Sequence, residues 1–234
     1  VNRLRRTKKV IITGSNSKLL SGELATHLTG RYIDFTLFPF SFREFLIFNN
    51  IKIDKFVTSE DISEIKKSLR EYIEVGGFPE AYLFGKEMVV RTYFDIIEKD
   101  VIRRLKIRKV YALKELSKYL VSNFSNEISF RKMSNILEIR DAHTVRNWIN
   151  GLENSYLFFI LERYSPKLKQ QIIAPKKVYC IDSGIITSLA FRISENFGKL
   201  IENLVAIELF RRKSYWFNNW EIYYFKDYQQ REVD

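Results

Sequence analysis

The segment RDAHTVRN, residues 140–147, gathers side chains that can donate hydrogen bonds to nucleic acid. These donors are Arg140, His143, Thr144, Arg146 and Asn147. Side chains of these types reach phosphate oxygens and base edges in a DNA major groove. A second polar set follows about 20 residues later and comprises Lys167, Lys169, Gln170 and Gln171. The two sets predict contact with DNA. The alternative is a packing module whose charges are only solvated.

Nucleotide binding by a Walker A loop requires a glycine-rich turn followed by Lys and Ser or Thr, which together neutralise the β- and γ-phosphates. The pairs Gly85-Lys86 and Gly198-Lys199 lack the upstream glycine and the following hydroxyl. We therefore expect this chain to be inactive as an ATPase and to bind no ATP tightly. A zinc site is not expected either, because the sequence has two histidines and one cysteine.

The overall charge favours an anionic partner. Lysine and arginine outnumber aspartate and glutamate by 39 to 28, which gives a formal net charge of +11. Such a balance attracts polyanions, with nucleic acid as the first partner to consider and an anionic membrane surface as the second. No apolar run approaches the roughly 20 residues needed to span a bilayer, so we expect no membrane insertion and a cytoplasmic location. Cys180 is expected to be a small buried hydrophobe. A homo-oligomer is left open.

The elements that must position these residues fall into four stretches, which predict an α/β plus α fold. Residues 1–40 alternate strand, helix and strand, as in part of a parallel α/β sheet. Residues 41–109 read as a helical lid, with Ser41 as one helix cap, Ser59 or Asp61 as the next start, and Gly76 as its stop. Residues 110–179 and 180–234 form the third and fourth predicted units.

The third unit has the pattern of a winged helix, that is, three helices followed by a β-ribbon. Helical patterns cover 112–124, 129–139 and 141–155, and two strand-like segments flank the polar tip at 166–175. Ser129 and Asp141 are the expected caps of the second and third helices. The third helix places Val145, Trp148, Ile149 and Leu152 on one face.

Several short motifs occur in a fixed order along the chain: VIITGSNS, LTGRYIDFTLFPFSFREFL, YIEVGGFPEAYL, IDSGI, GKLIENLVAIELFRR and REVD. In this order they resemble archaeal and bacterial AAA-type ATPases with a DUF4143 C-terminal region, over essentially all 234 residues. The resemblance implies ATP and magnesium as cofactors of the intact protein, with the Walker segments upstream of Val1. It also implies that Thr13 or Ser15 is the sensor residue and that Arg31 is an arginine finger or sensor arginine. Without the resemblance, these residues belong to an ordinary turn and an ordinary helix end.

The final stretch resembles the start of a PD-(D/E)XK nuclease-like fold, an incomplete restriction-endonuclease-like domain. By this resemblance Glu202 on a helix and Asp234 on a strand would be catalytic and would hold Mg²⁺. The remaining carboxylate and lysine would lie on a strand after Asp234. The alternative for Glu202 is a surface acid near Arg211 and Arg212.

The sequence thus predicts part of an AAA-type ATPase that couples nucleotide binding to engagement of DNA or of a protein partner. Two other classes stay open. One is a DNA-binding or protein-binding module without catalytic activity. The other is an Mg²⁺-dependent nuclease in the intact protein. The helix 198–212 is expected to bury Leu200, Leu204, Val205, Ile207 and Leu209 against the C-terminal strands.

Overall fold

The computed structural model describes residues 11, 13, 14, 33, 35–51, 58–190, 197–227, 229 and 231–233, which form a mixed α/β fold that is mostly helical. The helices are α2 Phe42–Phe48, α3 Ser59–Val75, α4 Pro79–Phe84, α5 Glu87–Asp95, the π-helix η2 Ile96–Arg103, α6 Val110–Ser122, α7 Phe130–Ile136, α8 Ala142–Asn154, α9 Leu168–Ile173, α10 Ser183–Leu189 and α11 Phe197–Tyr215. The strands are β1 Asn126–Ile128, β2 Phe158–Arg163, β3 Lys176–Cys180, β4 Tyr223–Lys226 and β5 Glu232–Val233.

These strands form one five-stranded sheet with the order β1-β3-β2-β4-β5. The pairs β1/β3, β2/β3 and β4/β5 are antiparallel, whereas β2 and β4 run parallel. Phe158 lies opposite Cys180, and Glu162 lies opposite Tyr223. The segments REVD and WEIYYF, which are far from the other strands in the sequence, pair in the β4/β5 ladder.

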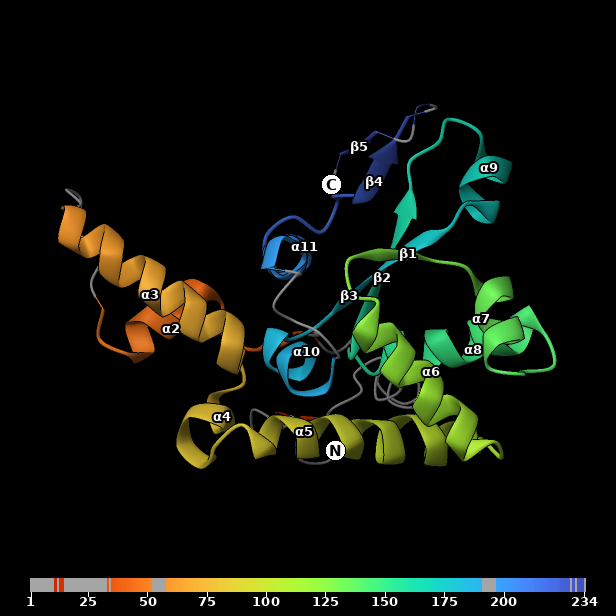
Figure 1. Cartoon of the computed structure of the whole chain (residues 1–234), viewed down its shortest axis with the longest axis horizontal. Helices are drawn as coiled ribbons and strands as arrows, with labels where there is room; N and C mark the ends of the chain where they lie inside the picture. Colours follow the sequence, from red (N-terminus) through yellow and green to blue (C-terminus); the bar gives the residue numbers. More distant parts are fainter. Residues whose placement is uncertain are drawn as a thin grey trace, which may run out of the picture.

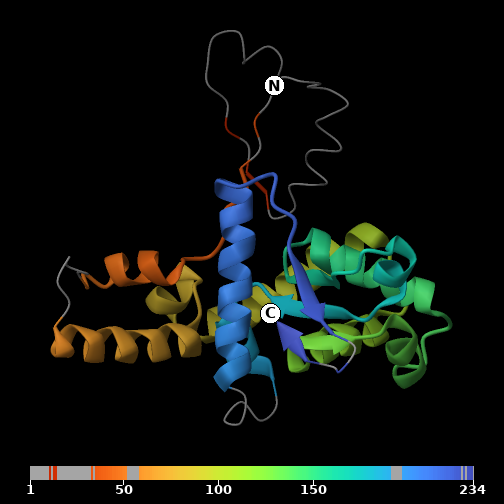
Figure 2. The same cartoon turned by 90° about the horizontal axis from the view of Figure 1, so that it is seen from above.

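The helices surround this sheet on several sides. In Figure 1, α2, α3 and α4 lie on the left, α5 runs along the bottom into η2, and α6, α7 and α8 lie on the right. Figure 2 shows α11 standing between the α2–α3 arm and the part of the molecule that holds the sheet. The candidate DNA-contacting helix α8 therefore lies on the opposite side of the molecule from α3.

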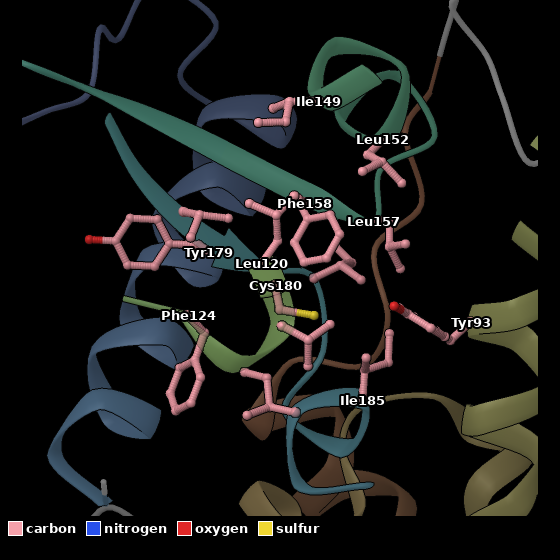
Figure 3. Packing of buried hydrophobic residues seen from close by; sticks show 14 of the residues in the cluster. Tyr93, Leu120, Phe124, Ile149, Leu152, Leu157, Phe158, Tyr179, Cys180 and Ile185 are labelled. Atoms are coloured by element: carbon pink, nitrogen blue, oxygen red, sulfur yellow. The ribbon is translucent and has the colours of Figure 1, made fainter. Parts of the chain in front are cut away.

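One large hydrophobic cluster extends from Phe38 to Tyr224 and includes side chains of the sheet and of the surrounding helices. Figure 3 shows Cys180 among Leu120, Phe158 and Ile185. Cys180 is fully buried, which confirms the expectation of a buried small hydrophobe, and burial raises the pKa of its thiol to about 12. Because the cluster has members in all four predicted stretches, it offers no boundary between them, and the division into domains stays a prediction.

Capping residues explain where several helices begin and end. Ser41 caps α2 as expected, and its side chain and that of Glu44 form a capping box. Helix α3 begins at Ser59, one of the two predicted starts; Thr58 caps it, and Asp61 completes its capping box. Gly76 ends α3 with φ of 94°, a backbone angle that favours glycine.

The segment 36–40 is fixed against the rest of the fold by hydrogen bonds that involve its main chain. The hydroxyl of Tyr215 accepts from the Phe38 amide at 3.0 Å, and Arg211 donates to the Pro39 carbonyl at 3.0 Å. The Phe40 amide donates to the Gly77 carbonyl at 2.7 Å, and the Tyr72 hydroxyl donates to the Phe40 carbonyl. This segment is therefore tied to both α3 and α11.

Three features differ from the sequence-based expectations. The short strand β1 was not expected, and the polar tip at 166–175 contains the helix α9. Val205 was expected to be buried but is 52% exposed, because Leu200, Asn203, Ala206 and Ile207 take the inner face of α11. The expected parallel sheet of residues 1–40 falls mostly outside the described residues. Among the described helices, none combines the length and apolar character that crossing a bilayer requires.

Candidate functional site

Helix α8 is anchored on one face and polar on the other. Its cap is Asp141, as predicted, and the carboxylate accepts from the Thr144 amide at 2.7 Å. This amide holds the pKa of Asp141 below its usual value. Val145, Ile149 and Leu152 are buried as expected, and Trp148 packs against the same core. The anchored face fixes the direction in which the polar face points.

The structure brings most of the predicted donors together at the start of α8. Arg140, His143, Arg146 and Asn147 are exposed. Arg140 and Arg146 form no ion pair within the described part of the chain. The His143 ring contacts the Asn147 side-chain amide at 3.2 Å, so these two groups form one polar unit.

Thr144 has a different role from the other donors. Its hydroxyl donates to the Asp141 carboxylate at 3.3 Å, and its side chain is half-buried. The residue thus supports the helix cap, while Arg140 and Arg146 remain the exposed cations of this surface. Sequence alone could not separate these roles, because both types of residue occur at the start of helices.

The connection between β2 and β3 carries the second predicted set. Lys167 and Lys169 are exposed at the start of α9. Gln171 donates to the Glu162 carboxylate at 2.9 Å, so its amide is directed back toward β2. Burial raises the pKa of Glu162. The hydrogen bonds from Lys176 and Gln171, together with the positive charges of Lys176 and Arg146, outweigh this effect, so the pKa lies below its usual value.

A polar hollow of about 690 Å³ lies between β1, β3 and α11. Glu202 on α11 accepts from Lys177 at 2.8 Å and from the Tyr179 hydroxyl at 2.9 Å. Lys177 is buried and also pairs with Glu232, while Lys226 pairs with Glu127 at 3.1 Å. These acids and lysines largely neutralise one another.

The nuclease resemblance requires this region to hold Mg²⁺, which binds several carboxylate oxygens. Among the described residues, no group of three His, Cys, Asp or Glu side chains could hold a metal ion. The ammonium of Lys177 lies against Glu202 and Glu232, where a cation would have to bind. The described residues therefore do not fit a magnesium site, and Asp234 lies outside them.

The ion pair of Glu202 does not involve Arg211 or Arg212, the residues near which the alternative reading placed it. Arg211 and Arg212 pair with Glu208, and Arg212 does so at 2.8 Å. The actual partner of Glu202, Lys177, was missed, because it lies 25 residues away on a buried strand. No local spacing signals such a contact.

The described residues include one of the three side chains assigned to nucleotide binding. Thr13 is exposed, whereas Ser15 and Arg31 lie outside the described residues. The roles of these three side chains in binding ATP therefore stay predictions.

Comparison with known proteins places this geometry in a wider context. A family model described as "AAA domain" matches residues 1–46, which agrees with the AAA part of the resemblance. An uncharacterized protein of Methanocaldococcus jannaschii is 39% identical over 212 residues, which cover 87% of this chain and 47% of the relative. An uncharacterized protein of Haemophilus influenzae is 32% identical over 211 residues, or 87% of this chain and 51% of the relative. No solved structure matches.

The chain spans about half the length of these curated relatives. A second family model covers more than half of this chain, from residue 66 to residue 196, and so includes α8 and the β2–β3 connection. Its description is "Domain of unknown function (DUF8612)", while the DUF4143 part of the resemblance stays a prediction. On this match, the chain belongs to the DUF8612 family.

Proposed function

We propose that this chain is part of an AAA-type ATPase and that residues 110–179 bind double-stranded DNA as a winged helix. The match of an AAA domain to residues 1–46 supports the first half of the proposal. In the intact protein, nucleotide binding would be coupled to DNA engagement through the segment 36–40, whose main chain is tied to α3 and α11.

The observation that carries the DNA proposal is the surface at the start of α8. The order of elements is α6, β1, α7, α8, β2 and β3, with β3 between β1 and β2 in the sheet. In a winged helix, the third helix enters the major groove. Here that helix is α8, and Arg140 just before it and Arg146 on it are exposed and form no ion pair among the described residues.

The dimensions are compatible with this docking. An α-helix with its side chains is about 10–12 Å across, and the B-DNA major groove is about 12 Å wide. Lys167 and Lys169 lie in the β2–β3 connection, which corresponds to the wing and would contact the neighbouring phosphates. Because these contacts are mainly ionic, binding should weaken steeply as salt rises.

The test is fluorescence anisotropy of a labelled DNA duplex titrated with the whole chain. Charge reversal in the variant Arg146→Glu/Lys169→Glu should weaken binding by about tenfold or more. The matched control is Lys66→Glu/Lys67→Glu, which makes the same charge change at exposed positions on α3. The control should bind nearly as well as the parent chain, because α3 lies on the opposite side of the molecule (Figure 1).

Two results would contradict the proposal. If the Arg146/Lys169 variant bound like the parent chain, α8 would be a packing element. If both variants lost the same affinity, binding would reflect the net charge of +11 and no particular surface.

A further inference from the structure

A short cationic turn joins η2 to α6, and neither the DNA-binding proposal nor the ATPase relationship uses it. We call residues 103–109 the basic elbow. Five of its seven residues are cationic, and all five are exposed: Arg103, Arg104, Lys106, Arg108 and Lys109. The window 3–9 near the start of the chain holds as many.

The acidic groups nearby neutralise only part of this charge. Arg104 lies 3.7 Å from the Asp100 carboxylate, and Arg103 lies 3.9 Å from that of Glu98. Glu98 is shared with Lys114 at 3.6 Å, so one carboxylate serves two cations. Within the described ranges, no ion pair involves the other three elbow cations, Lys106, Arg108 and Lys109.

The elbow is a fixed turn. The Ile107 amide donates to the Ile102 carbonyl at 3.0 Å, and the Lys106 amide donates to the Arg103 carbonyl at 3.4 Å. Ile102 is buried, and Ile107 packs against the main core. The backbone is thus held at both ends of the turn, so the cations are displayed at a defined place without a large loss of backbone entropy on binding.

The elbow lies next to α8. Gly151 on α8 approaches η2 so closely that a Cβ at this position would lie 2.5 Å from Leu105 and 3.4 Å from Val101. Arg146 precedes Gly151 by five residues and His143 precedes it by eight. At 1.5 Å per residue, these positions lie about 7.5 and 12 Å along the helix from the crossing.

This spacing suits a single duplex. B-DNA carries one phosphate charge per roughly 1.7 Å of helix axis, so a separation of about 10 Å spans several phosphates. Figure 1 shows the end of η2 and the start of α8 at the same end of the molecule. A duplex that receives α8 in its groove would therefore bring backbone phosphates near the elbow.

We propose that the basic elbow is a second phosphate-binding segment, which grips the backbone of the same duplex beside the groove that receives α8. This inference rests on the proposed DNA binding. It adds a contact to the phosphate backbone that does not depend on the base sequence of the DNA. A membrane surface is the less suitable polyanion, because helices that bind membranes present a broad apolar face. Among the elbow side chains, only Leu105 is both apolar and largely exposed.

The test compares the salt dependence of duplex binding for three proteins, measured by anisotropy. The elbow variant is Lys106→Gln/Arg108→Gln/Lys109→Gln, and the matched control is Lys66→Gln/Lys67→Gln/Arg70→Gln on α3. If each elbow cation neutralises one phosphate, the log–log salt slope of the elbow variant should become shallower by about 0.9 per cation, or about 2.7 in total. The control slope should be unchanged, and the loss should be equal for duplexes of unrelated sequence.

The outcomes separate the two proposals. If the parent chain bound no duplex, both proposals would fall. If the Arg146→Glu/Lys169→Glu variant bound weakly while the elbow variant kept the parental slope, the elbow inference alone would be wrong. It would also be wrong if the elbow variant lost binding to anionic phospholipid vesicles but kept duplex binding. Circular dichroism melting of each variant checks that it folds.

Discussion

Asp182 should make the stability of this protein depend on pH. The residue lies at the start of α10, is 4% exposed, and accepts a hydrogen bond from the Gly77 amide at one carboxylate oxygen. The other oxygen, Oδ1, has no hydrogen-bond partner among the described residues. Burial raises the pKa of the carboxyl from 3.8 to about 6, although the Gly77 amide opposes the shift. The folded state thus binds this proton more tightly than the unfolded state does.

The size and sign of the effect follow from this shift. A rise from 3.8 to about 6 is roughly two pH units, and each unit corresponds to about 1.4 kcal/mol. The protonated carboxyl therefore contributes about 3 kcal/mol to the free energy of unfolding, fully present below pH 3.8. This contribution is lost as the pH rises through about 6, because the folded state binds the proton more tightly than the unfolded state does. Tyr72 and Tyr82 stay neutral in this range, since burial raises their pKa values.

The measurement is urea unfolding at a series of pH values for the parent chain and for Asp182→Asn. Other carboxylates titrate in both proteins, so the difference between the two free energies of unfolding isolates Asp182. Relative to Asp182→Asn, the free energy of unfolding of the parent chain should fall by about 2.4 kcal/mol between pH 4 and pH 7, because at pH 4 the unfolded state is already partly ionised. Parallel curves, or a difference that rose with pH, would refute the reasoning, because the buried carboxyl would then have an ordinary or lowered pKa.

Two further predictions concern the same junction. Gly76→Ala should destabilise the protein by at least about 2 kcal/mol. The reason is that φ is 94° at this position and the new Cβ would overlap the Asp182 carboxylate. Thermal melting should show a lowered midpoint. Gly198→Ala is the control, since nothing lies within 4 Å of its added Cβ, and an unchanged or raised midpoint is expected; equal losses would contradict the argument. Tyr72→Phe should lower the free energy of unfolding, measured in urea, by about 1–3 kcal/mol. The substitution removes the hydroxyl that donates to the Phe40 carbonyl. An unchanged free energy of unfolding would mean that this hydrogen bond does not hold the segment 36–40.

Local signals in the sequence predicted the helices better than the strands. Ser41, Asp141 and Gly76 mark helix ends through side-chain caps or a positive φ, which depend on neighbouring residues only. The strand β1 has three residues, and its partner β3 lies about 50 residues further along the chain, so no local pattern reveals it. The helix α9 has no side-chain cap and no buried residue, so its sequence favours a polar tip over a helix.

The inner face of α11 could not be predicted from apolar spacing, because a polar residue takes part in it. Asn203 is 1% exposed and exchanges two hydrogen bonds of 2.9 Å with the backbone of Cys180. This pairing turns the neighbouring Val205 toward solvent. The ion pair between Glu202 and Lys177, which line the polar hollow, also depends on this packing. The fold was therefore more predictable from the sequence than the polar hollow.

Lysine labelling tests the proposed DNA interface most directly. The whole chain would be treated briefly with an amine-acetylating reagent, with and without a saturating DNA duplex, and each lysine read by mass spectrometry. We predict that the duplex protects Lys167 and Lys169 from acetylation, whereas Lys66 and Lys67 on α3 react equally in both samples. Equal reactivity of Lys167 and Lys169 with and without the duplex would contradict the assignment of α8 and the β2–β3 connection as the DNA-binding surface.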